Sequence, residues 1–121
     1  MATFRMIVRD VGASAAFYVT HFGFTLREQF GPAMAILDGD GLTLWLAGPL
    51  ASASRPMPDG DVPEPGGWNR PVFLIADLDQ RVATLKAAGV GFRNEIVSGP
   101  GGRQVLCLDP SGNVIELFEP A

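Results

Sequence analysis

The sequence predicts an α+β protein in which two βαβββ modules form a curved mixed sheet, or cup, with the helices outside. The order strand, capped helix and three strands occurs twice, on either side of a proline-rich stretch. The two halves also share residues, because Ile7-Val-Arg-Asp10-Val11 parallels Leu74-Ile-Ala-Asp77-Leu78. In the same way, Leu37-Asp-Gly-Asp-Gly41 parallels Leu108-Asp-Pro-Ser-Gly112. One face of each sheet is covered by its helix, and the open concave face is the natural pocket.

Length and composition limit the possible organisation and partners. We expect a single domain over residues 1–121, with modules at about 1–48 and 70–121 and a linker at about 49–69. The net charge of -4 and the lack of a Lys/Arg patch argue against nucleic acid and membranes as partners. No apolar run in the sequence approaches membrane-spanning length, so a cytoplasmic location is expected. The lone Cys107 lies in a predicted strand, as a small buried hydrophobe.

The first module begins with Thr3–Arg9, which has the β-branched content of a strand. Asp10 is a good N-cap for a helix whose apolar side chains recur at helical spacing, and Gly23 is expected to end that helix. Three further strands are predicted at 24–30, 33–37 and 42–46, with a tight turn at 38–41.

The stretch 49–69 holds five of the ten prolines and no periodic apolar signal, which indicates a linker or a functional loop over a site. A strand at 71–76 follows. Asp77 and Gln80 form the capping-box pattern of a second helix, which ends at Gly89. The remaining strands are predicted at 91–97, 103–108 and 113–119, with a hairpin connection at 99–102.

The last hairpin contains an unusual carboxylate. Asp109-Pro-Ser-Gly112 suits a type I turn between two apolar runs. Side chains alternate across a strand, so Glu116 shares a face with Val114 and Phe118. Because carboxylates are rarely buried unless they are paired or bound to a metal, the function depends on what Glu116 faces.

The motifs resemble a known family. Asp10 followed by Phe17-Tyr18 and Phe22-Gly23-Phe24, and the closing Asp109-Pro-Ser-Gly-Asn-Val-Ile-Glu-Leu117, resemble the glyoxalase, bleomycin-resistance and extradiol-dioxygenase (vicinal oxygen chelate) superfamily. The resemblance covers essentially the whole chain and implies the cup fold and a homodimer, with modules paired within one chain or between two. It does not select a function, because the superfamily includes isomerases, dioxygenases, epimerases and metal-free antibiotic-binding proteins.

The resemblance also implies where a metal would bind, on the first, fourth, fifth and eighth strands. Counted back from the helix-capping aspartates, the first-strand and fifth-strand positions are Thr3 and Arg70. The fourth-strand and eighth-strand positions are Trp45 and Glu116. Only Glu116 is a usual ligand, since Arg has no lone pair to give and Trp only donates. His21, the only histidine, lies at the end of the first helix, outside the cup strands. We therefore expect no cofactor, and a divalent metal is the disfavoured alternative.

Arg70 and Glu116 are open to more than one interpretation. They form either a purely structural ion pair or a polar anchor, in which Arg70 holds a ligand oxygen and Glu116 a donor group. Glu116 as a catalytic general base is a third option. Trp45 either stacks on a planar ligand or packs in the core. Trp68 closes the rim, packs on a partner subunit or packs in the core. Strand parity adds Arg5, Phe92 and Phe118 as cup neighbours.

These residues predict metal-independent binding of a small, partly aromatic molecule in the cup. The alternative is a lyase, isomerase or dioxygenase that uses a metal or Glu116 as a base. A third option is a protein that keeps the fold and serves only in assembly. The set that discriminates among them is Thr3, Trp45, Arg70 and Glu116.

Overall fold

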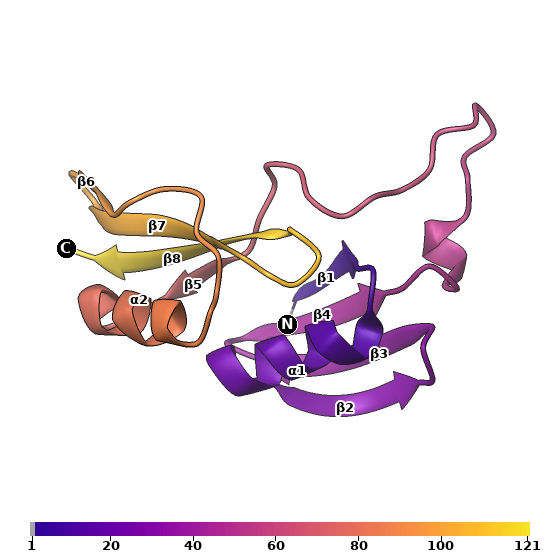
Figure 1. The fold of residues 1–121 in the computed structure, drawn as a ribbon, viewed down its shortest axis with the longest axis horizontal. Helices are drawn as coiled ribbons and strands as arrows, with labels where there is room; N and C mark the ends of the chain where they lie inside the picture. The colour runs from indigo at the N-terminus through magenta and orange to yellow at the C-terminus, as the bar shows by residue number, and fades with distance from the viewer. Residues whose placement is uncertain (1) are drawn as a thin grey trace. The chain divides into compact units, whose positions relative to one another are not determined.

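A computed structural model describes residues 2–121, which divide into two compact units. The first unit extends to Gly66 and also contains Pro110–Asn113, and the second contains Gly67–Asp109 and Val114–Ala121. Each unit has one helix and one four-stranded mixed sheet (Figure 1). The α+β class and the two βαβββ modules are therefore confirmed. No helix in the described chain has both the length and the apolar character needed to cross a membrane.

In the first unit, a parallel strand pair is joined by a helix, and two antiparallel strands complete the sheet in the order β1-β4-β3-β2. The elements are β1 (Ala2–Ile7), α1 (Val11–Phe22), β2 (Thr25–Phe30), β3 (Met34–Gly39) and β4 (Leu42–Ala47).

Local signals in the sequence set both ends of α1. The Asp10 side chain accepts a hydrogen bond from the Ala13 N–H, and Gly23 ends the helix in the left-handed region at φ 69°. The helix packs against its sheet through Tyr18, which is fully buried and donates a hydrogen bond to the Met6 sulfur at 3.2 Å. As a result, one face of the first sheet is covered and the other remains open.

The proline-rich segment has one short 3₁₀ turn, η1 (Ser52–Ser54), and is otherwise irregular, as predicted. Its end is fixed by the turn between the last two strands. Gly66 donates its N–H to Asn113 Oδ1 at 2.7 Å, and Asn113 Nδ2 donates to the Ile7 carbonyl at 2.9 Å. Residues 110–113 are therefore part of the first unit, although they connect two strands of the second.

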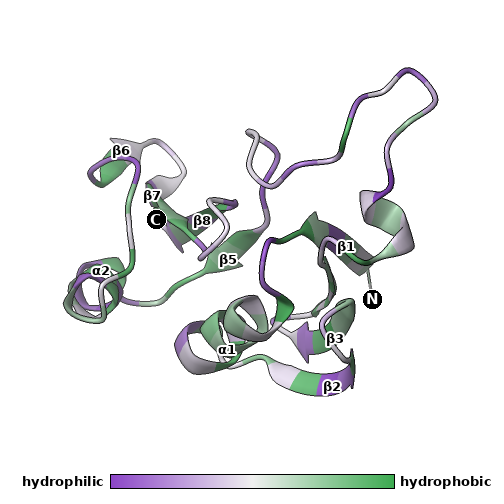
Figure 2. Cartoon of the chain, turned by 45° about the vertical axis from the view of Figure 1, so that its right-hand side comes forward, coloured by the Kyte–Doolittle hydropathy of each residue, from purple (hydrophilic) through white to green (hydrophobic). Residues whose placement is uncertain are grey.

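The second unit repeats the arrangement, with β5 parallel to β8 in a sheet of order β5-β8-β7-β6. All three residues of β5 are apolar (Figure 2). The elements are β5 (Val72–Leu74), α2 (Leu78–Ala87), β6 (Val97–Gly99), β7 (Gly102–Leu108) and β8 (Val114–Pro120).

The start of α2 differs from the predicted capping box. Asp77 accepts the Gln80 N–H as expected, but the Gln80 amide extends along the helix to Thr84 instead of returning to the cap. The Leu78 N–H, which has no partner within the helix, donates a hydrogen bond to Glu119 Oε2 on β8 at 2.8 Å. This tertiary contact satisfies a different first-turn N–H from the one that a capping box would bind, which is that of Asp77.

The predicted strand at 91–97 was wrong in extent. Phe92 makes one isolated bridge to Cys107, and β6 begins only at Val97. The reason is Asn94, whose side-chain Oδ1 accepts the Leu106 N–H at 2.9 Å. A side chain here occupies a donor that a continuous strand would bind with its backbone, so the ladder stops.

Candidate functional site

The second sheet has one face packed under α2 and one open face. The packed face is made of Phe73, Leu117 and the buried residues paired beside them. On the open face, Glu116 lies between Val72 of β5 and Leu106 of β7. Residues that are paired across neighbouring strands have their side chains on the same face of the sheet, so the Glu116 carboxylate lies between the aliphatic side chains of Val72 and Leu106.

Glu116 and Arg70 form an ion pair on this open face. Arg70 donates from Nε at 3.0 Å and from Nη2 at 2.8 Å, and both hydrogen bonds end on Glu116 Oε1. Glu116 is only 8% exposed, and the Arg70 side chain is 27% exposed. In the part of the chain that the structure describes, Oε2 receives no hydrogen bond. One oxygen therefore neutralises the arginine, and the other can still accept a proton or a hydrogen bond.

Trp68 and Arg93 lie next to this pair. Arg70 Nη1 donates to the Trp68 carbonyl at 3.2 Å, and the Arg93 guanidinium carbon lies 4.1 Å from the centre of the Trp68 ring. The backbone of Arg93 is held in place, because its N–H donates a hydrogen bond to the Leu106 carbonyl at 2.9 Å. Since Leu106 is the strand partner of Glu116, Arg93 lies one strand away from the carboxylate.

Arg93 was not identified from the sequence as a residue of this face, and Phe92 was predicted there instead. The structure pairs Phe92 with Cys107, which is fully buried on the helix-facing side, and Lys86 Nζ of α2 lies 5.5 Å from the Phe92 ring centre. Phe92 is therefore not on the open face, and the next residue is. Phe118 does share the open face with Glu116, opposite Leu74 and Gln104.

Thr3, Arg5 and Trp45 lie together on the open face of the first sheet. Thr3 and Arg5 of β1 are paired in register with Thr43 and Trp45 of β4. The Arg5 guanidinium carbon is 4.9 Å from the centre of the Trp45 ring, so a cation already covers one side of the indole. A planar ligand that stacks on Trp45 would have to use its other side or displace Arg5.

The strand register reproduces the repeat that the sequence shows. Trp45 is paired with Arg5 in the first sheet, as Glu116 is paired with Val72 in the second. Arg5 and Val72 each lie five residues before the aspartate that caps the following helix. Trp45 and Glu116 therefore occupy equivalent positions in the two modules.

The family model for the Glyoxalase/Bleomycin resistance protein/Dioxygenase superfamily matches residues 1–117. The chain belongs to this superfamily. A comparison with curated proteins finds no match.

Solved structures of other proteins have the same fold. TnmS3, an antibiotic binding protein from Streptomyces sp. CB03234, is 29% identical, with a TM-score of 0.72 over 98% of this chain and 93% of its own. A superfamily member from Sphaerobacter thermophilus DSM 20745 is 28% identical, with a TM-score of 0.75 over 98% and 95% of the two chains. The fosfomycin resistance protein FosX from Listeria monocytogenes is 18% identical, with a TM-score of 0.75 over 100% and 93%, which shows the fold alone.

The residues of this glyoxalase-superfamily protein do not fit the divalent metal that the superfamily implies. Of the four ligand positions, only Glu116 has a metal-binding side chain, and Arg70 already occupies one of its oxygens. Trp45 carries the Arg5 cation on its ring. Among residues 2–121, no group of three or more His, Cys, Asp and Glu side chains is placed to hold a metal ion.

Neither the histidine nor the cysteine supplies a ligand to these positions. His21 lies at the C-terminal end of α1, with its ring 5.0 Å from that of Phe17. Cys107 is fully buried, and burial raises the pKa of its thiol to about 12. A thiol that keeps its proton at neutral pH is a poor metal ligand and a poor nucleophile.

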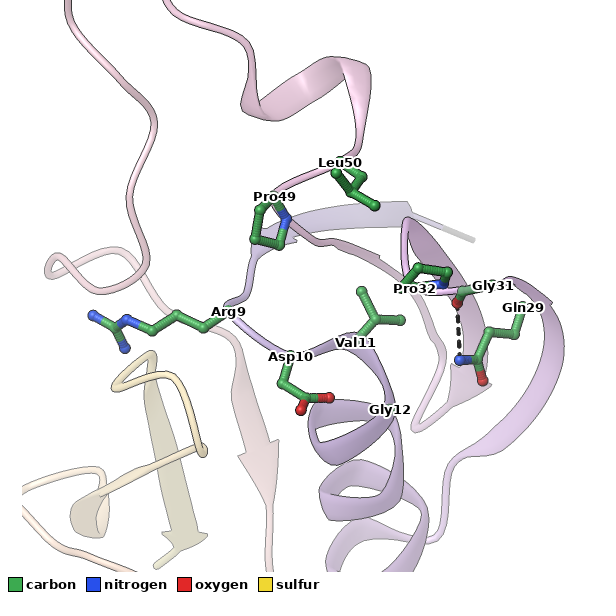
Figure 3. Close-up of a pocket in the computed structure, with 9 residues that line it drawn as sticks. All are labelled: Arg9, Asp10, Val11, Gly12, Gln29, Gly31, Pro32, Pro49 and Leu50. Carbon is green, nitrogen blue, oxygen red and sulfur yellow. Dashed lines mark hydrogen bonds between the residues drawn. The ribbon is translucent and has the colours of Figure 1, made fainter.

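A separate cleft of about 510 Å³ lies in the first unit (Figure 3). It contains none of the predicted site residues. Its polar groups already have structural roles, because Asp10 caps α1 and Gln29 Nε2 binds the Gly31 carbonyl. The Arg9 side chain points away from the cleft in Figure 3, and its guanidinium binds the Ser111 carbonyl. We therefore place the candidate site on the open face of the second sheet.

Proposed function

We propose that this protein binds a small, partly aromatic molecule without a metal, on the open face of the second sheet around Arg70 and Glu116. One observation carries the proposal. Glu116, a residue that is 8% exposed, binds Arg70 through one carboxylate oxygen, and its other oxygen receives no hydrogen bond within the described chain. Binding sites for small molecules combine an apolar surface with a few polar groups in fixed positions.

Each residue has a distinct role in this proposal. Arg70 is held in place by Glu116 and by the Trp68 carbonyl, so it presents a positioned cation to a carboxylate, phenolate or carbonyl oxygen. Glu116 Oε2 accepts a donor group of the ligand. Val72, Leu106 and Phe118 supply the apolar surface beside them. The antibiotic-binding activity of TnmS3, at 29% identity, supports a binding function.

The experiment combines metal analysis with ligand titration. Purified protein is incubated with Mn, Fe, Ni and Zn, desalted and analysed for metal, and aromatic antibiotics are then titrated while Trp fluorescence is recorded. We expect no stoichiometric metal, and Glu116→Gln should weaken binding about tenfold. Glu95→Gln is the matched control, because the Glu95 side chain is 91% exposed. Stoichiometric metal that is lost in Glu116→Gln would overturn the proposal.

A second candidate is a lyase, isomerase or dioxygenase of the same superfamily. It is favoured by the same uncommitted Oε2, because a general base needs an oxygen that can take a proton from the substrate. Turnover of a candidate substrate that is lost in Glu116→Gln, with binding retained, would favour this function over binding alone.

We also propose that the protein forms a homodimer. Large apolar side chains on the surface of the first unit support this assembly, with Leu50 at 73% and Phe30 at 51% exposure. Light scattering coupled to size-exclusion chromatography measures the mass directly. A monomer at all protein concentrations would exclude the dimer and leave the binding proposal unaffected.

A further inference from the structure

We propose that Arg93 and Trp68 form a second recognition site on the open face of the second sheet, which takes the anionic group of a planar aromatic ligand. The group is a carboxylate, sulfonate or phosphonate. This proposal rests on the proposed function, since it specifies the ligand class for the same face of the protein.

The first argument is that Arg93 lacks a carboxylate partner. Two other arginines on the sheets are paired, Arg27 with Asp38 and Arg103 with Asp79 and Glu119. Among residues 2–121, no acidic side chain lies within ion-pair distance of the Arg93 guanidinium.

The second argument is the way in which Arg93 is held. The carbon of its guanidinium lies 4.1 Å from the centre of the Trp68 ring, and its backbone N–H donates a hydrogen bond to the Leu106 carbonyl. A guanidinium that stacks on an aromatic ring keeps the N–H groups at its edge available for an oxyanion. Arg93 is thus positioned without using the donors that would recognise a ligand.

The third argument is the local charge. Arg70 and Arg93 lie on the open face with one carboxylate, Glu116, so this face carries one net positive charge in a chain whose net charge is -4. Glu95, the nearest acidic residue in sequence, interacts instead with Lys86 of α2, at 3.8 Å. A face whose charge opposes that of the whole chain favours an anionic ligand.

The fourth argument is that Trp68 links the two arginines. Its carbonyl binds Arg70 and its ring lies under Arg93, while 64% of the residue remains exposed. A planar ligand can therefore contact exposed parts of the indole while its oxyanion reaches Arg93. The same ligand can place an oxygen near Arg70, because both cations adjoin Trp68.

The test uses three probes that share one ring system and differ in charge: naphthoate, naphthalenemethanol and naphthylmethylammonium. Isothermal titration calorimetry measures their affinities for the full chain, for Arg93→Gln and for the control Arg55→Gln. Arg55 is an exposed residue of the irregular segment, and its substitution removes the same charge. We expect naphthoate to bind about tenfold more tightly than the alcohol, with the cation weakest.

Arg93→Gln should remove the preference for naphthoate and leave the affinity for the alcohol unchanged, whereas Arg55→Gln should retain the preference. Added salt should weaken naphthoate binding to the unsubstituted protein and to Arg55→Gln more than to Arg93→Gln, because the interaction with Arg93 is between charges. Equal binding of all three probes, with no effect of Arg93→Gln, would overturn this inference and leave the proposed function in place. Failure of every probe to bind would count against both.

Discussion

Removal of Arg70 tests whether Arg70 and Glu116 on the open face stabilise the fold through their interaction with each other. Arg70→Met keeps an apolar stem beside Trp68 but leaves the largely buried Glu116 side chain without its cation. Exposed pairs contribute about 0.2–1 kcal/mol, and breaking a fully buried pair costs about 3–5 kcal/mol. With side-chain exposures of 27% and 10%, this pair lies between these limits. We expect Arg70→Met to lower the unfolding free energy by about 2 kcal/mol.

The assay is a double-mutant cycle with Arg70→Met, Glu116→Gln and the double variant, measured by urea and thermal unfolding. A loss of about 2 kcal/mol corresponds to a Tm decrease of about 8 °C for a chain of this length. The double variant should be more stable than the sum of the single effects predicts, since no charge is left alone. Single effects that add to within about 0.5 kcal/mol would refute the coupling.

Two further predictions concern the second unit. The Leu78 N–H and Arg103 lower the pKa of Glu119, so its contribution to stability is present above the ordinary glutamate value of 4.5 and is lost as the pH falls through the lowered value. Unfolding curves of Arg103→Gln and the unsubstituted protein should therefore differ at pH 7 and converge in acid, and a constant difference would contradict this. Gly102→Ala should prevent folding, because its Cβ would lie 2.1 Å from the Glu119 carbonyl at φ +146°. Gly101→Ala, whose Cβ would meet only Phe118 at 3.8 Å, should retain a native circular dichroism spectrum.

The fold was predictable because its signals are local. Asp10 and Asp77 bind N–H groups only three residues ahead, and Gly23 adopts its left-handed conformation within its own residue. Both can be read from a short window of sequence. The alternation that placed Glu116 and Phe118 on one face is equally local.

The details of the site depended on contacts that no periodicity encodes. Asn94 interrupts the strand with its side chain, and the resulting register turns Phe92 toward α2 and puts Arg93 on the open face. Arg5 covers Trp45 because two strands that are distant in sequence pair in parallel. The resemblance to the family suggested a pairing of Arg70 with Glu116, but the sequence could not show that the two meet or that both hydrogen bonds end on one oxygen of Glu116.

The position of the last turn affects how the chain can be synthesised and divided. Asn113 binds Ile7 and Gly66, and Ser111 binds Arg9, so the first unit takes its final hydrogen bonds from residues near the C-terminus. During translation, this unit cannot complete its contacts until residues 110–113 have left the ribosome. A gene fragment cut in the proline-rich segment would likewise encode an incomplete first module. Although the sequence reads as a tandem duplication, the two copies are not separable building blocks.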